Sequence, residues 1–279
     1  MLVELAIGDA YGAQFEFADP ELVTAHNHLR YLKVRDDRVP PGHYTDDTQQ
    51  SIAIAELLIE GVDWTPENIA QKFVEVYHRD PRPGYSRRVR TALHASTSGA
   101  EFLTNIDPFS DRSGASMRAC PLGIIADIPE LIERTTIQAK VSHDTPLGIQ
   151  AAVATALAAH YCIYEIGDLR DLGQFVTKHV AGDWNLPYQE FVGQKGWMSV
   201  RAAFTAIQSH TNLADMLKAC IAFTGDVDTV ATIALGASAQ VAIIENNLPD
   251  ELYQGLEAGN YGLEYLQKLD EKWLKLKKL

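Results

Sequence analysis

The sequence has few of the features that mark a zinc-thiolate site or a secreted, disulfide-bonded protein. Its 279 residues include only three cysteines, Cys120, Cys162 and Cys220. No two of them have the C-x-x-C spacing of a zinc site, and isolated cysteines in odd number are typical of reduced thiols. The N-terminus also lacks a basic segment followed by an apolar one. We therefore expect a cytoplasmic protein without a signal peptide.

Long apolar runs and basic charge are scarce as well. The longest mostly apolar run covers residues 230–244, and it is too short and too often interrupted by polar residues to span a bilayer. The formal net charge is −13, whereas sequence-independent binding to nucleic acid requires a basic surface. We expect neither membrane nor general nucleic-acid binding. A phosphate-bearing ligand would need metal ions, backbone amides or a few arginines close by.

Runs of alternating β-branched residues are missing, and helix-type periodicity recurs in most segments. Hydrophobic residues make up 46% of the chain, which is near the globular average, and no linker or low-complexity segment divides it. The sequence therefore predicts an all-α protein with a single domain over residues 1–279. Helices are expected to end near Gly12 and to cover residues 20–27, 48–61, 129 onward, 149–164, 200–207 and 213–222. Gly8 and Gly12, four residues apart, would let another helix pack tightly against the first one. A further helix is expected to begin at Thr65-Pro66-Glu67, and a last helix bears Leu266, Leu269, Trp273 and Leu276 on one stripe.

Two acidic stretches stand directly before long helix-compatible runs: Thr45-Asp46-Asp47-Thr48 and Asp226-Val227-Asp228-Thr229. Aspartate and threonine are common N-caps, so capping explains one such stretch. One cap needs only one side-chain oxygen, however, and each stretch has two carboxylates within three residues. Neighbouring carboxylates repel unless a cation lies between them, and Mg²⁺ or Mn²⁺ is held by a few carboxylates plus water. We predict that the two helix starts face each other and hold such ions.

Several other segments have two interpretations. Glu16 is either a solvated loop carboxylate or a site residue. The basic segment 79–90 is either a solvated loop or an anion contact through Arg82, Arg87, Arg88 and Arg90. His26 and His28 form an H-x-H pair, for which exposure to solvent is the simpler interpretation.

Two further segments favour contact with an anionic ligand. Small residues at 113–117 open a predicted helix, and the free backbone N–H groups of a helix start suit phosphate oxygens. On its own this signal is weak, because the segment has neither the Walker nor the dinucleotide spacing. The pair Ser142-His143 precedes another helix, where the histidine either caps the helix or touches a ligand hydroxyl group.

Taken in order, these motifs resemble those of the ADP-ribosylglycohydrolase family, which includes ADP-ribosylarginine hydrolases and the dinitrogenase-reductase-activating glycohydrolase. The resemblance runs from residue 8 to residue 229. It rests on Gly8-Asp9-Ala10-Tyr11-Gly12, Tyr44-Thr45-Asp46-Asp47-Thr48, Gly114-Ala115-Ser116-Met117-Arg118, Ser142-His143 and Gly225-Asp226-Val227-Asp228-Thr229.

The resemblance implies a compact, orthogonally packed helical domain whose cleft holds two Mg²⁺ or Mn²⁺ ions. It implies that Glu16 is a ligand or gate to the metals, or a base, and that the loop at Gly84-Tyr85 borders the cleft. Family members often have Asn where Ser113 stands, and Asp80 is the only acidic candidate near the Gly84 loop. The implied metal ligands are Thr45, Asp46, Asp47, Asp226, Asp228 and Thr229. The implied ADP-ribose contacts are Gly114, Ala115, Ser116, Met117, Ser142 and His143.

The resemblance predicts a metal-dependent hydrolase that removes ADP-ribose from a modified protein or a small molecule. Cleavage at the anomeric carbon passes through an oxocarbenium-like state, metal ions would hold ribose hydroxyls and activate a water, and Glu16, Asp46 or Asp47 would accept the water's proton. Two alternatives stay open: a non-catalytic ADP-ribose-binding relative, and a two-metal phosphohydrolase acting on a nucleotide.

Overall fold

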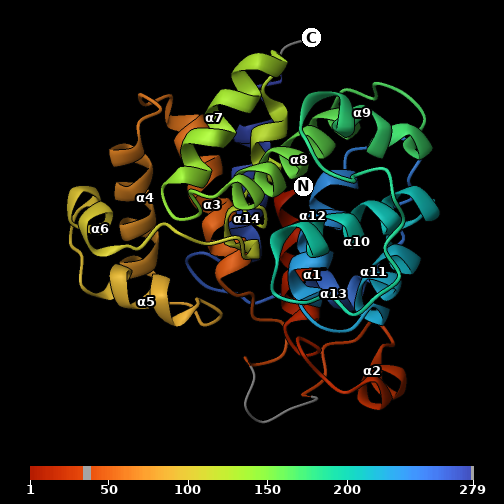
Figure 1. Ribbon diagram of the computed structural model, residues 1–279. Coiled ribbons are helices and arrows are strands. Elements are labelled where there is room, and N and C mark those ends of the chain that lie inside the picture. The colour runs from red at the N-terminus through yellow and green to blue at the C-terminus, as the bar shows by residue number, and fades with distance from the viewer. Residues whose placement is uncertain (34–38, 278–279) are drawn as a thin grey trace.

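The computed structural model describes residues 1–33 and 39–277, which form helices joined by loops (Figure 1). No strand occurs among these residues, and the prediction of an all-α fold is confirmed. The α-helices are α1 (Leu2–Gly12), α2 (Pro20–His26), α3 (Asp46–Glu60), α4 (Pro66–Arg79), α5 (Arg87–His94), α6 (Gly99–Asn105), α7 (Ile128–Lys140), α8 (Pro146–Ile163), α9 (Leu172–His179), α10 (Gly196–Ser209), α11 (Leu213–Ala222), α12 (Val227–Ser238), α13 (Asp250–Gln254) and α14 (Leu263–Leu274). Short 3₁₀ turns cover Ser113–Ala115, Cys120–Ile124 and Leu169–Asp171.

Local sequence signals set several helix ends. Helix α3 ends at Gly61, which has φ 65° and ψ 27° and therefore suits a residue without a Cβ. Helix α4 begins as predicted, because the Thr65 side chain accepts a hydrogen bond from the Asn68 amide and Pro66 occupies the first position. The basic segment differs from the prediction. Ser86 caps a new helix, α5, so that Arg87 and Arg90 are exposed helical residues.

Helices α1 and α12 cross at the centre of the molecule, where Figure 1 shows them side by side. Two glycines on α1 make this approach possible. A Cβ at Gly8 would lie 2.7 Å from the Ala231 carbonyl oxygen, and a Cβ at Gly12 would lie 2.4 Å from the Cα of Asp228. The predicted tight packing at Gly8 and Gly12 is confirmed, and it fixes the start of α12 against the end of α1.

The hydrophobic core includes residues from both ends of the chain. Of the predicted stripe, Leu266, Leu269 and Trp273 are buried on α14, whereas Leu276 lies after the end of the helix and is half-buried. Trp273 donates its indole N–H to the Pro121 carbonyl. Cys120, Cys162 and Cys220 are buried free thiols. Helix α8, rather than residues 230–244, is the long apolar segment: by length and composition alone it could cross a membrane, but 78% of it is buried inside the fold, where it packs against α7, α10 and α12.

Candidate active site

The two acidic helix starts meet at one cavity of about 250 Å³. Asp46 and Asp47 lie in the first turn of α3, Asp226 is the residue before α12, and Asp228 lies in its first turn. All four line the cavity, and their exposed fractions are only 4–8%. The stretches touch directly, because the Thr229 hydroxyl donates to Asp47 Oδ1 at 3.0 Å. The structure thus brings together segments that lie far apart in the sequence.

Asp46 and Asp47 are not used to cap α3, whereas in α12 the Asp228 carboxylate accepts from the Thr229 amide at 2.9 Å. The start of α3 is satisfied instead by Asp9, a fully buried residue of α1. Asp9 Oδ2 accepts from the Thr45 amide and the Thr48 amide, both at 2.9 Å, and from the Thr48 hydroxyl at 2.6 Å. The Thr45 hydroxyl donates to Asp9 Oδ1 at 2.8 Å. Because Asp9 satisfies the helix start from a neighbouring element, Asp46 and Asp47 can face the cavity.

Close backbone contacts hold the acidic side chains in position. Gly84 has φ 99°, and a Cβ there would lie 2.0 Å from Asp46 Oδ1, so only glycine allows the loop to cover this carboxylate. The Asp46 amide donates to the Pro83 carbonyl. On the other side, the Asp226 amide donates to the Val192 carbonyl at 2.9 Å, and Ser199 Oγ donates to Asp226 Oδ2 at 3.1 Å.

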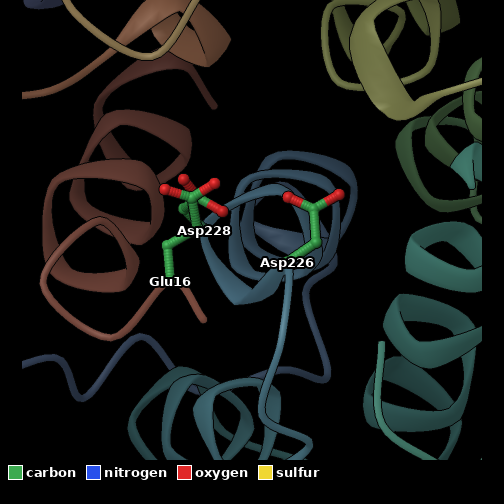
Figure 2. A group of neighbouring side chains, drawn as sticks. All are labelled: Glu16, Asp226 and Asp228. Atoms are coloured by element: carbon green, nitrogen blue, oxygen red, sulfur yellow. The ribbon is translucent and has the colours of Figure 1, made fainter. Parts of the chain in front are cut away.

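Glu16, Asp226 and Asp228 form the group best placed to hold a metal ion. One carboxylate oxygen from each lies within 4.8 Å of the others. Figure 2 shows the carboxylates of Glu16 and Asp228 side by side and that of Asp226 facing the same space. Glu16 is half-buried and comes from the turn after α1. The donor set consists of hard carboxylate oxygens, which Mg²⁺ and Mn²⁺ prefer and soft metals do not.

The electrostatics of the cluster also fit a cation. Burial, followed by repulsion from Asp9, raises the pKa of Asp46 and of Asp47 well above the usual aspartate range. Burial, followed by repulsion from Glu16, does the same to the pKa of Asp228. Among the described residues, no lysine or arginine forms an ion pair with Asp46, Asp47, Asp226 or Asp228. A divalent cation would supply the missing positive charge.

The other side of the cavity is basic. It is lined by Arg88, Arg112, Arg118 and His143. His143 is buried, and burial together with the neighbouring arginines lowers its pKa well below the usual histidine range. Its ring packs on Gly114, where a Cβ would lie 2.7 Å from His143 Cε1. The cavity therefore has an acidic side suited to cations and a basic side suited to anions.

Some of the predicted site residues line the cavity and others support it. The predicted residues in the lining are Glu16, Asp46, Asp47, Gly114, Met117, His143, Asp226, Asp228 and Thr229, together with Gly84 of the bordering loop. Thr45, Ala115, Ser116 and Ser142 are not in the lining. Thr45 donates to Asp9, and Ser116 Oγ donates to the Ser113 carbonyl at 2.8 Å. Ala115 is fully buried and its carbonyl accepts from Gln138.

The predicted helix start at 113–117 is wrong in detail. The chain makes only a short 3₁₀ turn at Ser113–Ala115, so it presents no regular α-helical N-terminus. Asp80 lies outside the cavity lining, since its carboxylate pairs with Arg82, which also binds Glu257. His26 and His28 are exposed and take no part in the acidic group.

Sequence reasoning missed Gln50 and quoted Asp9 and Arg118 only as parts of motifs, without a role. Arg118 is fully buried, and Arg118 and Gln50 both line the cavity. One signal was present for Asp9: it is an acidic residue near the C-terminal end of a mostly apolar helix, where the helix dipole disfavours negative charge.

Comparison with known proteins gives a consistent result. Over its full length the chain is 27% identical to an uncharacterised protein of Archaeoglobus fulgidus, covering 97% of that protein. Over 82% of its length it is 25% identical to the ADP-ribosyl-[dinitrogen reductase] glycohydrolase of Rhodospirillum rubrum, covering 80% of that protein. It is also 30% identical to ADP-ribosylhydrolase ARH3 of Xenopus tropicalis, over 58% of this chain and 49% of the relative.

A solved structure titled ADP-ribosylglycohydrolase-related protein complex has the same fold, with a TM-score of 0.73 at 20% identity over 99% of this chain and 96% of that one. The family model for ADP-ribosylglycohydrolase matches residues 1–277. Because that match spans nearly the whole chain, including both acidic helix starts, the chain belongs to the ADP-ribosylglycohydrolase family.

Proposed function

We propose that the protein is a Mg²⁺- or Mn²⁺-dependent hydrolase that cleaves the glycosidic bond between ADP-ribose and a modified protein side chain or a small-molecule acceptor. The observation that carries this proposal is the cavity with two unlike sides. Asp46, Asp47, Asp226 and Asp228 gather on one side, and arginines and His143 gather on the other. A ligand with a neutral sugar next to a diphosphate matches that arrangement of charge.

The acidic side would act on the ribose. Asp226, Asp228 and Glu16 would hold divalent cations, with Asp46, Asp47 and Thr229 beside them. Bound cations would supply Lewis acidity to a water molecule and to ribose hydroxyl groups. Glu16, Asp46 or Asp47 would accept the proton of that water, and the gathered carboxylates would favour positive charge developing at the anomeric carbon.

The basic side would hold the diphosphate. Arg88 and Arg112 line the cavity next to the backbone of Ser113 and Gly114, and arginine is suited to bidentate contact with phosphate oxygens. This local positive charge supports anion binding by a protein whose overall net charge is −13. The cytoplasmic location stays a prediction, with which the three buried free thiols agree.

The decisive test is release of ADP-ribose from peptides modified at arginine or serine, followed by mass spectrometry with Mg²⁺ or Mn²⁺ present. Asp46→Asn and Asp228→Asn should each lower the rate by about 100-fold or more, because loss of a cation contact costs several kcal/mol and 1.36 kcal/mol is tenfold in rate. The exposed Asp63→Asn is a matched control that should keep the wild-type rate. Undiminished rates of both site variants in the presence of chelator would refute the proposal.

The same experiment separates the two alternatives. Calorimetric binding of ADP-ribose without turnover of any modified peptide would identify a non-catalytic binding protein. Release of inorganic phosphate from a panel of nucleotides, with no release of ADP-ribose, would identify a two-metal phosphohydrolase.

A further inference from the structure

Arg118 is the most deeply buried cation beside the cavity. It is only 1% exposed, and its guanidinium lies 4.5 Å from the centre of the Phe73 ring. Its N–H groups donate to Gln138 Oε1 and Gln50 Oε1, both at 2.6 Å, and to the Gln138 carbonyl at 2.9 Å. No carboxylate among the described residues forms an ion pair with it. These bonds fix the position and orientation of the guanidinium.

One further bond joins Arg118 to the cavity wall. Arg118 Nη2 donates to Ser142 Oγ at 2.9 Å, and Ser142 Oγ lies 2.8 Å from His143 Nδ1. A guanidinium has donors only, so Ser142 Oγ must accept from Arg118. The serine hydroxyl hydrogen is then left to be donated, and His143 Nδ1 is the one remaining partner of Ser142 Oγ among the described residues. Together, the hydrogen bonds from Arg118 to Ser142 and from Ser142 to His143 make His143 Nδ1 an acceptor.

An acceptor Nδ1 places the single proton of a neutral imidazole on Nε2. Nε2 has no hydrogen-bond partner among the described residues, although His143 is only 3% exposed and lines the cavity. His143 Nε2 is not one of the fully buried polar atoms that lack a partner, so this edge of the ring opens on the cavity, where its N–H can donate to an acceptor oxygen of a ligand. The flat contact with Gly114 keeps this edge of the ring in place.

We propose that Arg118 is a positioning residue: through Ser142 it holds His143 as the neutral Nε2–H tautomer, whose free N–H donates to an acceptor oxygen of the bound ligand. The identity of that ligand as an ADP-ribose compound rests on the proposed function, but the tautomer does not. The oxygen belongs either to the diphosphate or to the distal ribose. A histidine with its proton on Nδ1 would turn a lone pair toward the same position, where it would repel a diphosphate oxygen, which has no proton to donate.

The tautomer can be read from two-bond ¹H–¹⁵N correlations of the imidazole rings in the whole ¹⁵N-labelled protein, without ligand. His143 should show an unprotonated Nδ1 and a protonated Nε2. The same spectrum contains a reference histidine in the opposite tautomer. His160 Nδ1 faces the carbonyls of Gly123 and Ile125, which only accept, so His160 must have its proton on Nδ1.

Ser142→Ala should shift His143 toward the Nδ1–H form or a mixture, and Ser142→Thr, which keeps the hydroxyl, should restore the wild-type spectrum. Ser96→Ala is the matched control, since Ser96 is equally buried and its hydroxyl, which donates to the Ala92 carbonyl and accepts from Asn105 Nδ2, bonds to no histidine ring among the described residues. Arg118→Lys tests the hydrogen bond from Arg118 to Ser142. Circular dichroism of each variant separates loss of the fold from loss of the tautomer.

Calorimetry then measures the consequence for binding. Ser142→Ala should weaken ADP-ribose binding by about fivefold, the value of one ordinary hydrogen bond. Titration with ADP locates the oxygen: an equal loss for ADP assigns it to the diphosphate, and a loss for ADP-ribose alone assigns it to the distal ribose. A wild-type His143 protonated on Nδ1, or a Ser142→Ala variant with unchanged tautomer and unchanged affinity, would overturn the proposal. Absence of hydrolysis with the tautomer intact would count against the proposed function only.

Discussion

At the scale of single residues, the position of Asp46 depends on the missing side chain of Gly84. The loop backbone crosses directly over the Asp46 carboxylate, at the place where a Cβ would be 2.0 Å from Oδ1. Gly84→Ala should therefore displace the carboxylate and strain a backbone at φ 99°. We expect a loss of roughly 1–3 kcal/mol in the free energy of unfolding and at least a tenfold fall in hydrolytic rate.

Gly61 offers a control, because it also has a positive φ but an added Cβ would contact no other atom. It has φ 65°, and nothing lies within 4 Å of the Cβ that alanine would add. Gly61→Ala should cost about 1 kcal/mol of stability and leave the rate unchanged. Thermal melting and the peptide assay distinguish the two variants. If both lose stability and neither loses rate, the contact with Asp46 has no role in activity.

At the scale of elements, the start of α3 is held by a residue from another helix. Asp9 of α1 accepts four hydrogen bonds from Thr45 and Thr48, which leaves the carboxylates of α3 facing the cavity. Asp9→Ala would leave buried donors without acceptors, each costing about 1–3 kcal/mol. We expect a loss of about 3 kcal/mol in the free energy of unfolding, faster amide exchange in the first turn of α3 and loss of hydrolysis.

An ordinary N-cap shows what this arrangement adds. Thr65 caps α4 through its own side chain, and its loss should cost about 1 kcal/mol without affecting hydrolysis. Denaturant unfolding of Asp9→Ala and Thr65→Ala, each paired with the activity assay, makes the comparison. Equal losses of stability with full activity in both variants would mean that Asp9 acts as a local cap and nothing more.

The same elements show what the sequence can and cannot predict. Helix α3 was predictable because its signals, Thr45 at the start and Gly61 at the end, lie within the segment itself. The acidic pairs were visible because two carboxylates stand within three residues of each other. The role of Asp9 was not predictable from local pattern, because its partners Thr45 and Thr48 lie 36 and 39 residues away.

The segments at 113–117 and 87–90 were predicted least well. Residues 113–117 have the small side chains of a helix start but form a 3₁₀ turn, whose amides and carbonyls bond locally and to the neighbouring Gln138. The sequence placed Arg87 and Arg90 in a loop, because Pro81, Pro83 and Gly84 break the preceding helix. The new helix begins only three residues after that glycine, at Arg87.

At the scale of the whole molecule, the protein is acidic, yet its cavity has negative residues on one side and positive residues on the other. The carboxylates of α3 and α12 lie on one side, and Arg88, Arg112 and Arg118 lie on the other. Crossing of α1 and α12 at Gly8 and Gly12 fixes the acidic side, so its geometry depends on the core as much as on the loops. The net charge of −13 belongs to the whole chain, whereas the choice of ligand depends on the local pattern of charge in the cavity.

Because carboxylates gather on one side of the cavity, the stability of the fold should depend on both pH and bound metal. Without metal, burial and mutual repulsion raise the pKa of Asp46, Asp47 and Asp228 above the unfolded value of about 3.9. For such groups the folded state is favoured at low pH, and that contribution is lost as pH rises through the raised folded pKa. Metal-bound carboxylates must be ionised, so Mg²⁺ or Mn²⁺ should bind more tightly as pH rises.

The difference in melting temperature between metal-loaded and chelator-treated protein should therefore grow from pH 5.5 to pH 8. At a metal concentration of about 100 Kd, binding contributes about 2.7 kcal/mol, which corresponds to roughly 5 °C in a chain of this size. His143, whose pKa is lowered, favours unfolding as pH falls, but it does so in both samples and cancels in the difference. Asp228→Asn should melt higher than wild type in chelator at pH 8 and gain little from metal, because one repelling charge and one ligand are gone together. A difference that stays flat or shrinks with rising pH would show that the carboxylates are ionised without a cation, and that the acidic side does not hold metal.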